Sequence, residues 1–213
     1  MMRLGRKTSE LIHDMWQSLP VNKSYHLEKV WDPVTRLWHW LLAAGVITGW
    51  CIGEWRSFST IEWHFYLGYT TGVLLLFRYI WGFVGPEPVR HSTLIGSVKD
   101  LPAYAARMFS RQPSGLAGHN PLGALSVIAM MLALTAQVVS GLFAEDDGLF
   151  SAGPLSSEVS SSTVRQLTDY HGIGAKVLLG LFVLHLGAIG FYLVWKKENL
   201  IKPMLTGWKL IRR

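Results

Sequence analysis

Four apolar segments dominate the sequence, and each is close to the length of a membrane-spanning helix. They are Leu37–Ile52, Ile61–Phe83, Leu122–Phe143 and Ile173–Trp195. A helix needs about 20 residues to cross the hydrocarbon core, and the first segment reaches this length only with its flanking aromatic residues. Half of the 213 residues are hydrophobic and 16% are charged, whereas soluble domains are about 25% charged. We therefore predict an all-α membrane protein with a four transmembrane helix bundle.

Basic residues predict the orientation of these spans. Of the 20 Lys and Arg residues, 17 lie toward one side of the membrane: six before the first segment, five from Arg78 to Arg111, and six after the fourth segment. The other three lie on the opposite side: Arg56, Arg165 and Lys176. Because cytoplasmic loops are enriched in Lys and Arg, we predict both termini in the cytoplasm. The isoelectric point near 9.5 then reflects the inner loops and does not indicate a nucleic-acid surface.

This orientation divides the chain into three parts. They are a cytoplasmic N-terminal segment (1–33), a transmembrane domain (34–200) and a short cytoplasmic tail (201–213). The first twenty residues carry positive charge but no continuous apolar core, so they do not predict a signal peptide.

The two longer connections between spans differ in pattern. In the inner one, Val98, Leu101 and Met108 recur at helical spacing, which predicts a short helix on the inner leaflet. The outer connection, 145–170, is rich in serine and acidic residues, and we expect it to be irregular and exposed.

Four of the eight histidines fall in or beside the apolar segments. In antiparallel spans, His64 and His171 come to one depth on the outer side, and His39 and His185 to one depth near the cytoplasm. His171 and His185 are fourteen residues apart, which places them on one helix face about 21 Å apart. A lone intramembrane histidine usually makes an interhelical hydrogen bond, but two depth-matched pairs favour a ligand role. Three others are expected at the surface of inner polar segments: His13, His26 and His91.

Two imidazoles at each depth favour haem over zinc. They supply both axial positions of a haem iron, whereas a zinc site normally needs four ligands. The single Cys51 excludes an internal disulfide and a four-cysteine iron–sulfur site. Arg78, fourteen residues after His64, and Arg36, one turn before His39, are candidates to bind a haem propionate or to snorkel to the membrane edge.

Glycines are frequent in the first two spans. Gly45, Gly49 and Gly53 share one face of the first span, and Gly68 and Gly72 follow His64 at four and eight residues. They either give clearance for a macrocycle or allow close helix packing, and the sequence favours neither interpretation.

Four features together resemble a known family. They are "RLWHW" around His39, "RYIWGFVG" from Arg78, "GHNP" around His119, and the spacing of His171 and His185. The region 30–200 is similar to the bacterial cytochrome b561 superfamily, particularly the branch with the b-type cytochrome subunit of nickel-iron hydrogenases.

The resemblance implies a four-helix bundle in the bacterial inner (cytoplasmic) membrane that holds two bis-histidine b haems. It implies His39, His64, His171 and His185 as iron ligands, and electron transfer between a periplasmic redox partner and an exchangeable membrane quinone. His119 is expected to be structural or near a quinone pocket, and not an iron ligand.

The resemblance does not determine which periplasmic redox partner the protein uses. The outer connection "EWRSFST" is much shorter than in hydrogenase subunits, and the tail ends soon after the fourth span. These differences favour a periplasmic c-type cytochrome that docks on the acidic outer loop. A self-contained superoxide:quinone oxidoreductase, a hydrogenase subunit, and a non-redox membrane anchor remain as alternatives.

Overall fold

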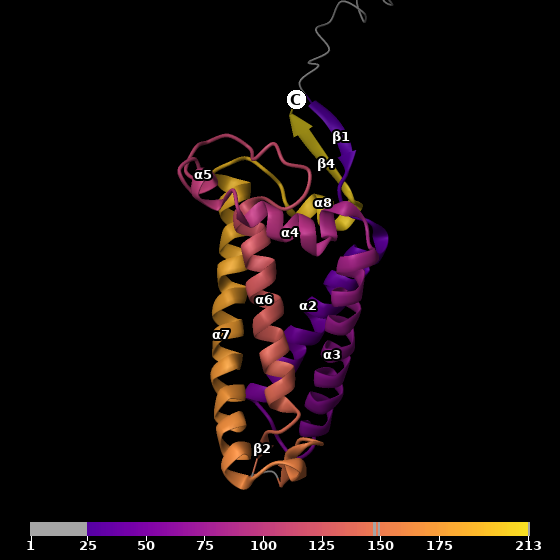
Figure 1. The fold of residues 1–213 in the computed structure, drawn as a ribbon, viewed down its shortest axis with the longest axis vertical. Coiled ribbons are helices and arrows are strands. Elements are labelled where there is room, and N and C mark those ends of the chain that lie inside the picture. Colours follow the sequence, from indigo (N-terminus) through magenta and orange to yellow (C-terminus); the bar gives the residue numbers. More distant parts are fainter. Residues whose placement is uncertain (1–24, 147, 149, 213) are drawn as a thin grey trace, which may run out of the picture.

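Four long helices run up and down the molecule (Figure 1). In this computed structural model, residues 25–146, 148 and 150–212 are described; the expectations for His13 and for a signal peptide lie outside them. The long helices are α2 (Pro33–Glu54), α3 (Ile61–Val84), α6 (Pro121–Gly141) and α7 (Ser161–Val194). α2 packs on α3 and α6 packs on α7, and α3 contacts α6. The bundle is therefore built from two helix hairpins.

Three of these helices are long and apolar enough to cross a membrane, within the described part of the chain. They are α3, α6 and α7, which confirms three of the four predicted spans by length and composition. α2 is a helix of 22 residues, but it is not among them. Its first two turns contain Thr35, Arg36 and His39 and its last residue is Glu54, and these polar groups lower its mean hydropathy.

Short helices cover the end of the bundle where α3 ends and α6 begins (Figure 1). They are η1 (Glu87–Val89), α4 (His91–Val98) and α5 (Leu101–Ala105). The inner-loop prediction is confirmed only in part, because the helix breaks at Lys99–Asp100. Pro102 lies in the first turn of α5, where the missing N–H of proline is tolerated, so a new helix starts there.

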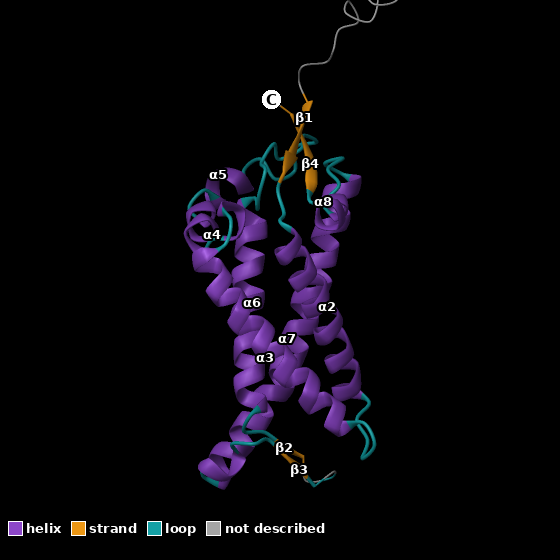
Figure 2. Cartoon of the chain, turned by 90° about the vertical axis from the view of Figure 1, so that its right-hand side faces the viewer, coloured by secondary structure: helices purple, strands orange, loops and turns teal. Residues whose placement is uncertain are grey.

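A two-stranded sheet joins the two ends of the described chain. β1 (Tyr25–Lys29) pairs antiparallel with β4 (Trp208–Arg212), which follows α8 (Ile201–Thr206). Gly207 turns the chain into β4 with a φ of 87°, a conformation that glycine adopts without strain. The sheet stands beyond one end of the bundle (Figure 2), so both ends of the described chain lie at that end. No regular structure was expected for these residues from the sequence.

The opposite end carries short elements that lead into α7. These are β2 (Glu145–Asp146), β3 (Ser151–Ala152) and η2 (Ser156–Glu158). The expectation of an irregular connection to residue 170 is wrong for its last ten residues, because α7 begins at Ser161. Ser160 caps α7 by accepting a hydrogen bond from the Thr163 N–H.

Candidate functional site

His64 on α3 and His171 on α7 meet near the β2–β3 end of the bundle. Their ring centroids are 6.0 Å apart and their planes are at 88°. Both side chains are half-buried. The two histidines that the sequence placed at one depth therefore come into contact across the two hairpins.

Backbone carbonyls of the other two long helices hold these rings. His64 Nδ1 lies 2.9 Å from the Gly49 carbonyl of α2, and His171 Nδ1 lies 3.0 Å from the Gln137 carbonyl of α6. A carbonyl only accepts, so Nδ1 of each ring carries the proton and Nε2 keeps its lone pair. A metal-binding imidazole commonly has this arrangement.

The side chain of Gln137 supports this assignment for His171. Its amide nitrogen lies 3.3 Å from His171 Nε2 and 3.1 Å from the His171 carbonyl. The amide donates, so it is compatible with a lone pair on Nε2. A metal ion bound at Nε2 would displace this amide. The sequence analysis did not identify Gln137.

Two glycines make room for the two imidazoles. A Cβ atom added at Gly53 would lie 2.8 Å from Cε1 of His64, and one added at Gly141 would lie 2.8 Å from Cε1 of His171. Any side chain at either position would push the ring away. Gly141 has no signal in the sequence, because nothing there shows which turn of α6 faces His171.

The other glycines resolve the alternatives that the sequence left open. Gly45 and Gly49 face side chains of α3 at ordinary contact distance, and Gly72 packs against Val138 of α6. These three serve helix packing. A Cβ at Gly68 would meet nothing within 4 Å, so Gly68 lies beside open space.

His39 on α2 and His185 on α7 lie toward the β1–β4 end. They are close enough for their charges to interact, but their rings do not make the contact that His64 and His171 make. His39 Nδ1 is buried and has no hydrogen-bond partner, and within the described chain the structure shows no hydrogen bond of the His185 side chain. His171 and His185 lie on one uninterrupted helix, so the two pairs are about 21 Å apart along α7.

Arg78 is buried, at 3% exposure, near this second pair. Its Nη2 donates to the Val89 carbonyl at 2.9 Å, and its guanidinium carbon lies 5.8 Å from the Trp38 ring centre. Its Nη1 is buried without a partner. Arg78 therefore points into the protein and does not snorkel to the surface.

Arg36 joins α2 to the C-terminal elements. Its Nη1 donates to the Leu205 carbonyl of α8, and its Nε is buried without a partner. The structure thus leaves one guanidinium nitrogen of Arg36 and one of Arg78 without a hydrogen bond at the same end of the bundle.

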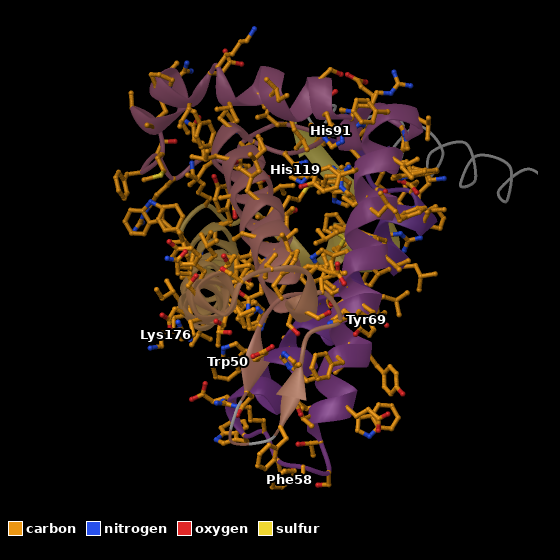
Figure 3. The ribbon with its side chains drawn as sticks, turned by 60° about the horizontal axis from the view of Figure 1, so that its bottom comes forward. Trp50, Phe58, Tyr69, His91, His119 and Lys176 are labelled. Atoms are coloured by element: carbon orange, nitrogen blue, oxygen red, sulfur yellow. The ribbon has the colours of Figure 1, made fainter. Side chains whose placement is uncertain are left out.

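His91 and His119 lie at this end, with Phe58 at the other (Figure 3). His91, which was expected at the surface, is half-buried: its Nε2 donates to the Tyr79 carbonyl at 3.0 Å, and its ring lies over Gly82. The absence of a Cβ at Gly82 makes this packing possible.

His119 precedes the Asn120 cap of α6, and its ring lies 4.7 Å from that of Trp31. Burial lowers the pKa of His119 to about 4, with a further contribution from the charge of Arg78. The ring is therefore neutral at pH 7.

Arg56 is a further cation near the first pair, and the sequence analysis counted it only as an outer base. It forms an ion pair with Asp146 of β2 and donates to the Gly53 carbonyl at 3.2 Å. Arg56 is therefore hydrogen-bonded to Gly53, the residue whose missing side chain leaves space for the His64 ring.

These features fit haem better than a multi-ligand metal ion. His64 and His171, with ring centroids 6.0 Å apart, would be the residues that hold the iron of a haem. In the described residues, no three or more His, Cys, Asp and Glu residues come together to hold a metal ion. Val164 and Tyr192 are the buried residues of α7, so most of this apolar helix is not covered by the described residues.

Comparison with known proteins identifies the family. A family model described as prokaryotic cytochrome b561 matches residues 30–207, from the end of β1 to the turn before β4. A search of curated proteins and a search of solved structures found no match. The family is one of membrane proteins that transfer electrons with b-type haem. Because the match covers most of the sequence, the chain belongs to the prokaryotic cytochrome b561 family.

Proposed function

We propose that the protein carries electrons across the bacterial inner membrane on two bis-histidine b haems, between a periplasmic redox partner and the quinone pool. His64 and His171 bind one haem, and His39 and His185 bind the other. In this proposal α2 is the fourth span, and the β1–β4 end faces the cytoplasm.

The arrangement around His64 and His171 carries this proposal. All four long helices contribute to it: α3 and α7 give the rings, and α2 and α6 give the carbonyls that fix Nδ1. An interhelical pair with a purely structural role needs neither a proton fixed on Nδ1 of both rings, which leaves Nε2 as the acceptor, nor a glycine behind each ring. The combination supports two ligands for one iron.

The second site rests on weaker contacts. His39 and His185 lie near each other, and Arg78 and Arg36 provide unpaired donors at the same end of the bundle. Carboxylates are the natural partners of such donors, and a haem carries two of them as propionates. We therefore assign Arg78 and Arg36 to the haem bound by His39 and His185.

The protein orients and insulates these sites. Bound b haem supplies a one-electron couple of the iron, and the protein supplies ligands, a low-dielectric interior and spacing. α7 fixes the spacing because it carries one ligand of each pair on a continuous helix.

The two ends have opposite charge, which supports the orientation and the partners. At the β2–β3 end, exposed carboxylates outnumber bases; they are Glu54, Glu62, Glu145, Glu158 and Asp169. Basic side chains are concentrated at the β1–β4 end, as the positive-inside rule requires of a cytoplasmic face. An acidic outer face suits a basic partner such as a c-type cytochrome, and the quinone then reacts at the inner end.

Optical spectroscopy of the purified protein tests this function. The reduced-minus-oxidised spectrum should show b haem, and the pyridine haemochrome assay should give two haems per chain. A value of one haem per chain would contradict the two-site arrangement. A protein without haem would support the alternative of a non-redox membrane anchor. If the protein oxidises superoxide and reduces quinone with no other protein present, it is a self-contained oxidoreductase and not an electron-transfer subunit.

A further inference from the structure

A buried arginine and a buried histidine are held by one short 3₁₀ helix at the β1–β4 end. Arg78 Nη2 donates to the Val89 carbonyl, and His119 donates to the carbonyl of the preceding residue, Pro88. Both carbonyls belong to η1. Side chains from α3 and from the start of α6 are thus fixed on adjacent peptide groups.

Each of these side chains has one buried nitrogen without a partner. The atoms are Arg78 Nη1 and His119 Nδ1. The Pro88 carbonyl accepts from His119, so Nε2 carries the proton and Nδ1 keeps its lone pair in the neutral ring. Buried polar atoms without partners are rare, and these two belong to side chains that are fixed on adjacent peptide groups of η1.

The surrounding charges favour an acidic ligand. The charged and titratable groups that act on His119 are Arg78 from α3, Lys209 from β4 and His39 from α2. Lys209 already pairs with Glu198 at 2.7 Å. Arg78 has no carboxylate partner within the described residues, and a buried cation without an anion is costly.

We propose that Arg78 and His119 together hold one propionate carboxyl group of the haem bound by His39 and His185. This rests on the proposed function, because it requires haem at that pair. Arg78 Nη1 donates to one carboxyl oxygen. The other oxygen shares one proton with His119 Nδ1, and that proton is taken from solvent on binding. Arg78 Nη1 and His119 Nδ1, the two buried atoms without partners, then both have one.

The experiment blocks the propionates chemically. Full-length wild type, His119→Phe and Arg78→Gln are prepared without haem and reconstituted with haem b or with its dimethyl ester. With haem b, each variant should bind the second haem about tenfold less tightly, the loss expected for a charge-assisted hydrogen bond. With the ester, wild type should already bind weakly, and neither substitution should weaken binding further.

Two controls keep the result interpretable. His26→Phe, on β1, where His26 contacts Glu28, should bind both forms like wild type. If His119→Phe does not fold, His119→Gln takes its place in the same comparison.

Two outcomes would overturn the proposal: equal weakening of haem b and ester binding by the His119 substitution, or no effect on either. Absence of haem at His39 and His185 in wild type would instead refute the proposed function, and this is visible before any variant is compared.

Discussion

His64 on α3 and His171 on α7 face each other with their ring centroids 6.0 Å apart. The Gly49 carbonyl of α2 and the Gln137 carbonyl of α6 fix Nδ1 of these rings. One histidine pair therefore depends on all four long helices, and a shift of any of them would change the distance between the two Nε2 atoms.

The first prediction concerns the space behind His64. Gly53→Ala should remove the haem bound by His64 and His171, because the new Cβ would lie 2.8 Å from Cε1 of the ring. The ring must turn away, and its Nε2 then leaves the ligand position. The haemochrome assay should fall from two haems per chain to one.

The matched control for this change is Gly45→Ala on the same helix. Its Cβ would meet Thr71 Oγ1 at 3.7 Å, an ordinary contact, and alanine is a better helix former than glycine. This variant should keep both haems. Two haems with an unaltered spectrum in Gly53→Ala would show that His64 is not a ligand.

The second prediction concerns the buried charge of Arg78. Arg78→Ala should lower the midpoint potential of the haem bound by His39 and His185, because a nearby cation favours the reduced, less positive iron. The expected shift is on the order of 60 mV, which corresponds to a tenfold change for a one-electron couple. A redox titration monitored by absorbance measures it.

Arg90→Ala serves as the control, since Arg90 is exposed and donates to the Gly85 carbonyl at the same end. Its titration should match that of wild type. Equal curves for Arg78→Ala and wild type would show that Arg78 does not act on the haem.

The third prediction follows from a buried ion pair that joins the segment after α7 to β4 of the terminal sheet. Glu198 accepts hydrogen bonds from Lys209 Nζ and from the N–H and Oγ of Ser114, each at 2.7 Å. Burial alone would raise the pKa of Glu198, but the hydrogen bonds from Lys209 and Ser114 and the Lys209 charge outweigh it and hold the pKa below its usual value.

The sign of the pH effect follows from this depressed pKa. The pair stabilises the fold fully above the unfolded pKa of about 4.3, and this stabilisation is lost as the pH falls through the lower pKa of the folded state. Glu198→Gln should lower the free energy of unfolding by about 3 kcal/mol at pH 7, because it leaves Lys209 buried and unpaired. The difference from wild type should narrow below pH 4.

Thermal unfolding followed by tryptophan fluorescence between pH 3 and pH 7, as an approximate range set by this pKa, measures the effect. Glu158→Gln, at an exposed carboxylate of the other end, should behave like wild type throughout. If Glu198→Gln is less stable than wild type by the same amount at every pH, the charge of Glu198 contributes nothing to the stability of the fold.

The sequence predicted those features that depend on local periodicity. Apolar segments separated by polar loops indicated the long helices, and the fourteen-residue spacing placed His171 and His185 on one face of α7. The pairing of β1 with β4 could not be predicted, because it joins two five-residue segments from opposite ends of the chain and no local pattern encodes their contact.

Partners of the histidines were missed for a related reason. Gln137 and Gly141 contact His171 through the packing of α6 on α7, and an apolar helix gives no periodic signal for the side that meets its neighbour. The start of α7 was missed because residues 161–170 are polar, and hydropathy marks the apolar part of a helix but not its solvent-exposed extension.

The last prediction separates the two histidines of α7. His185→Ala should remove the haem shared with His39 and leave the other reducible by a donor at the β2–β3 end. Electrons should then fail to reach a quinone at the β1–β4 end. His171→Ala should have the converse effect, with loss of reduction by that donor and retained reduction from the quinone side. The spectra and the two reduction assays of these variants must differ, because one helix carries the two residues about 21 Å apart. Loss of both haems in each folded variant, or loss of only the His64 haem in His185→Ala, would contradict the pairing of ligands by depth.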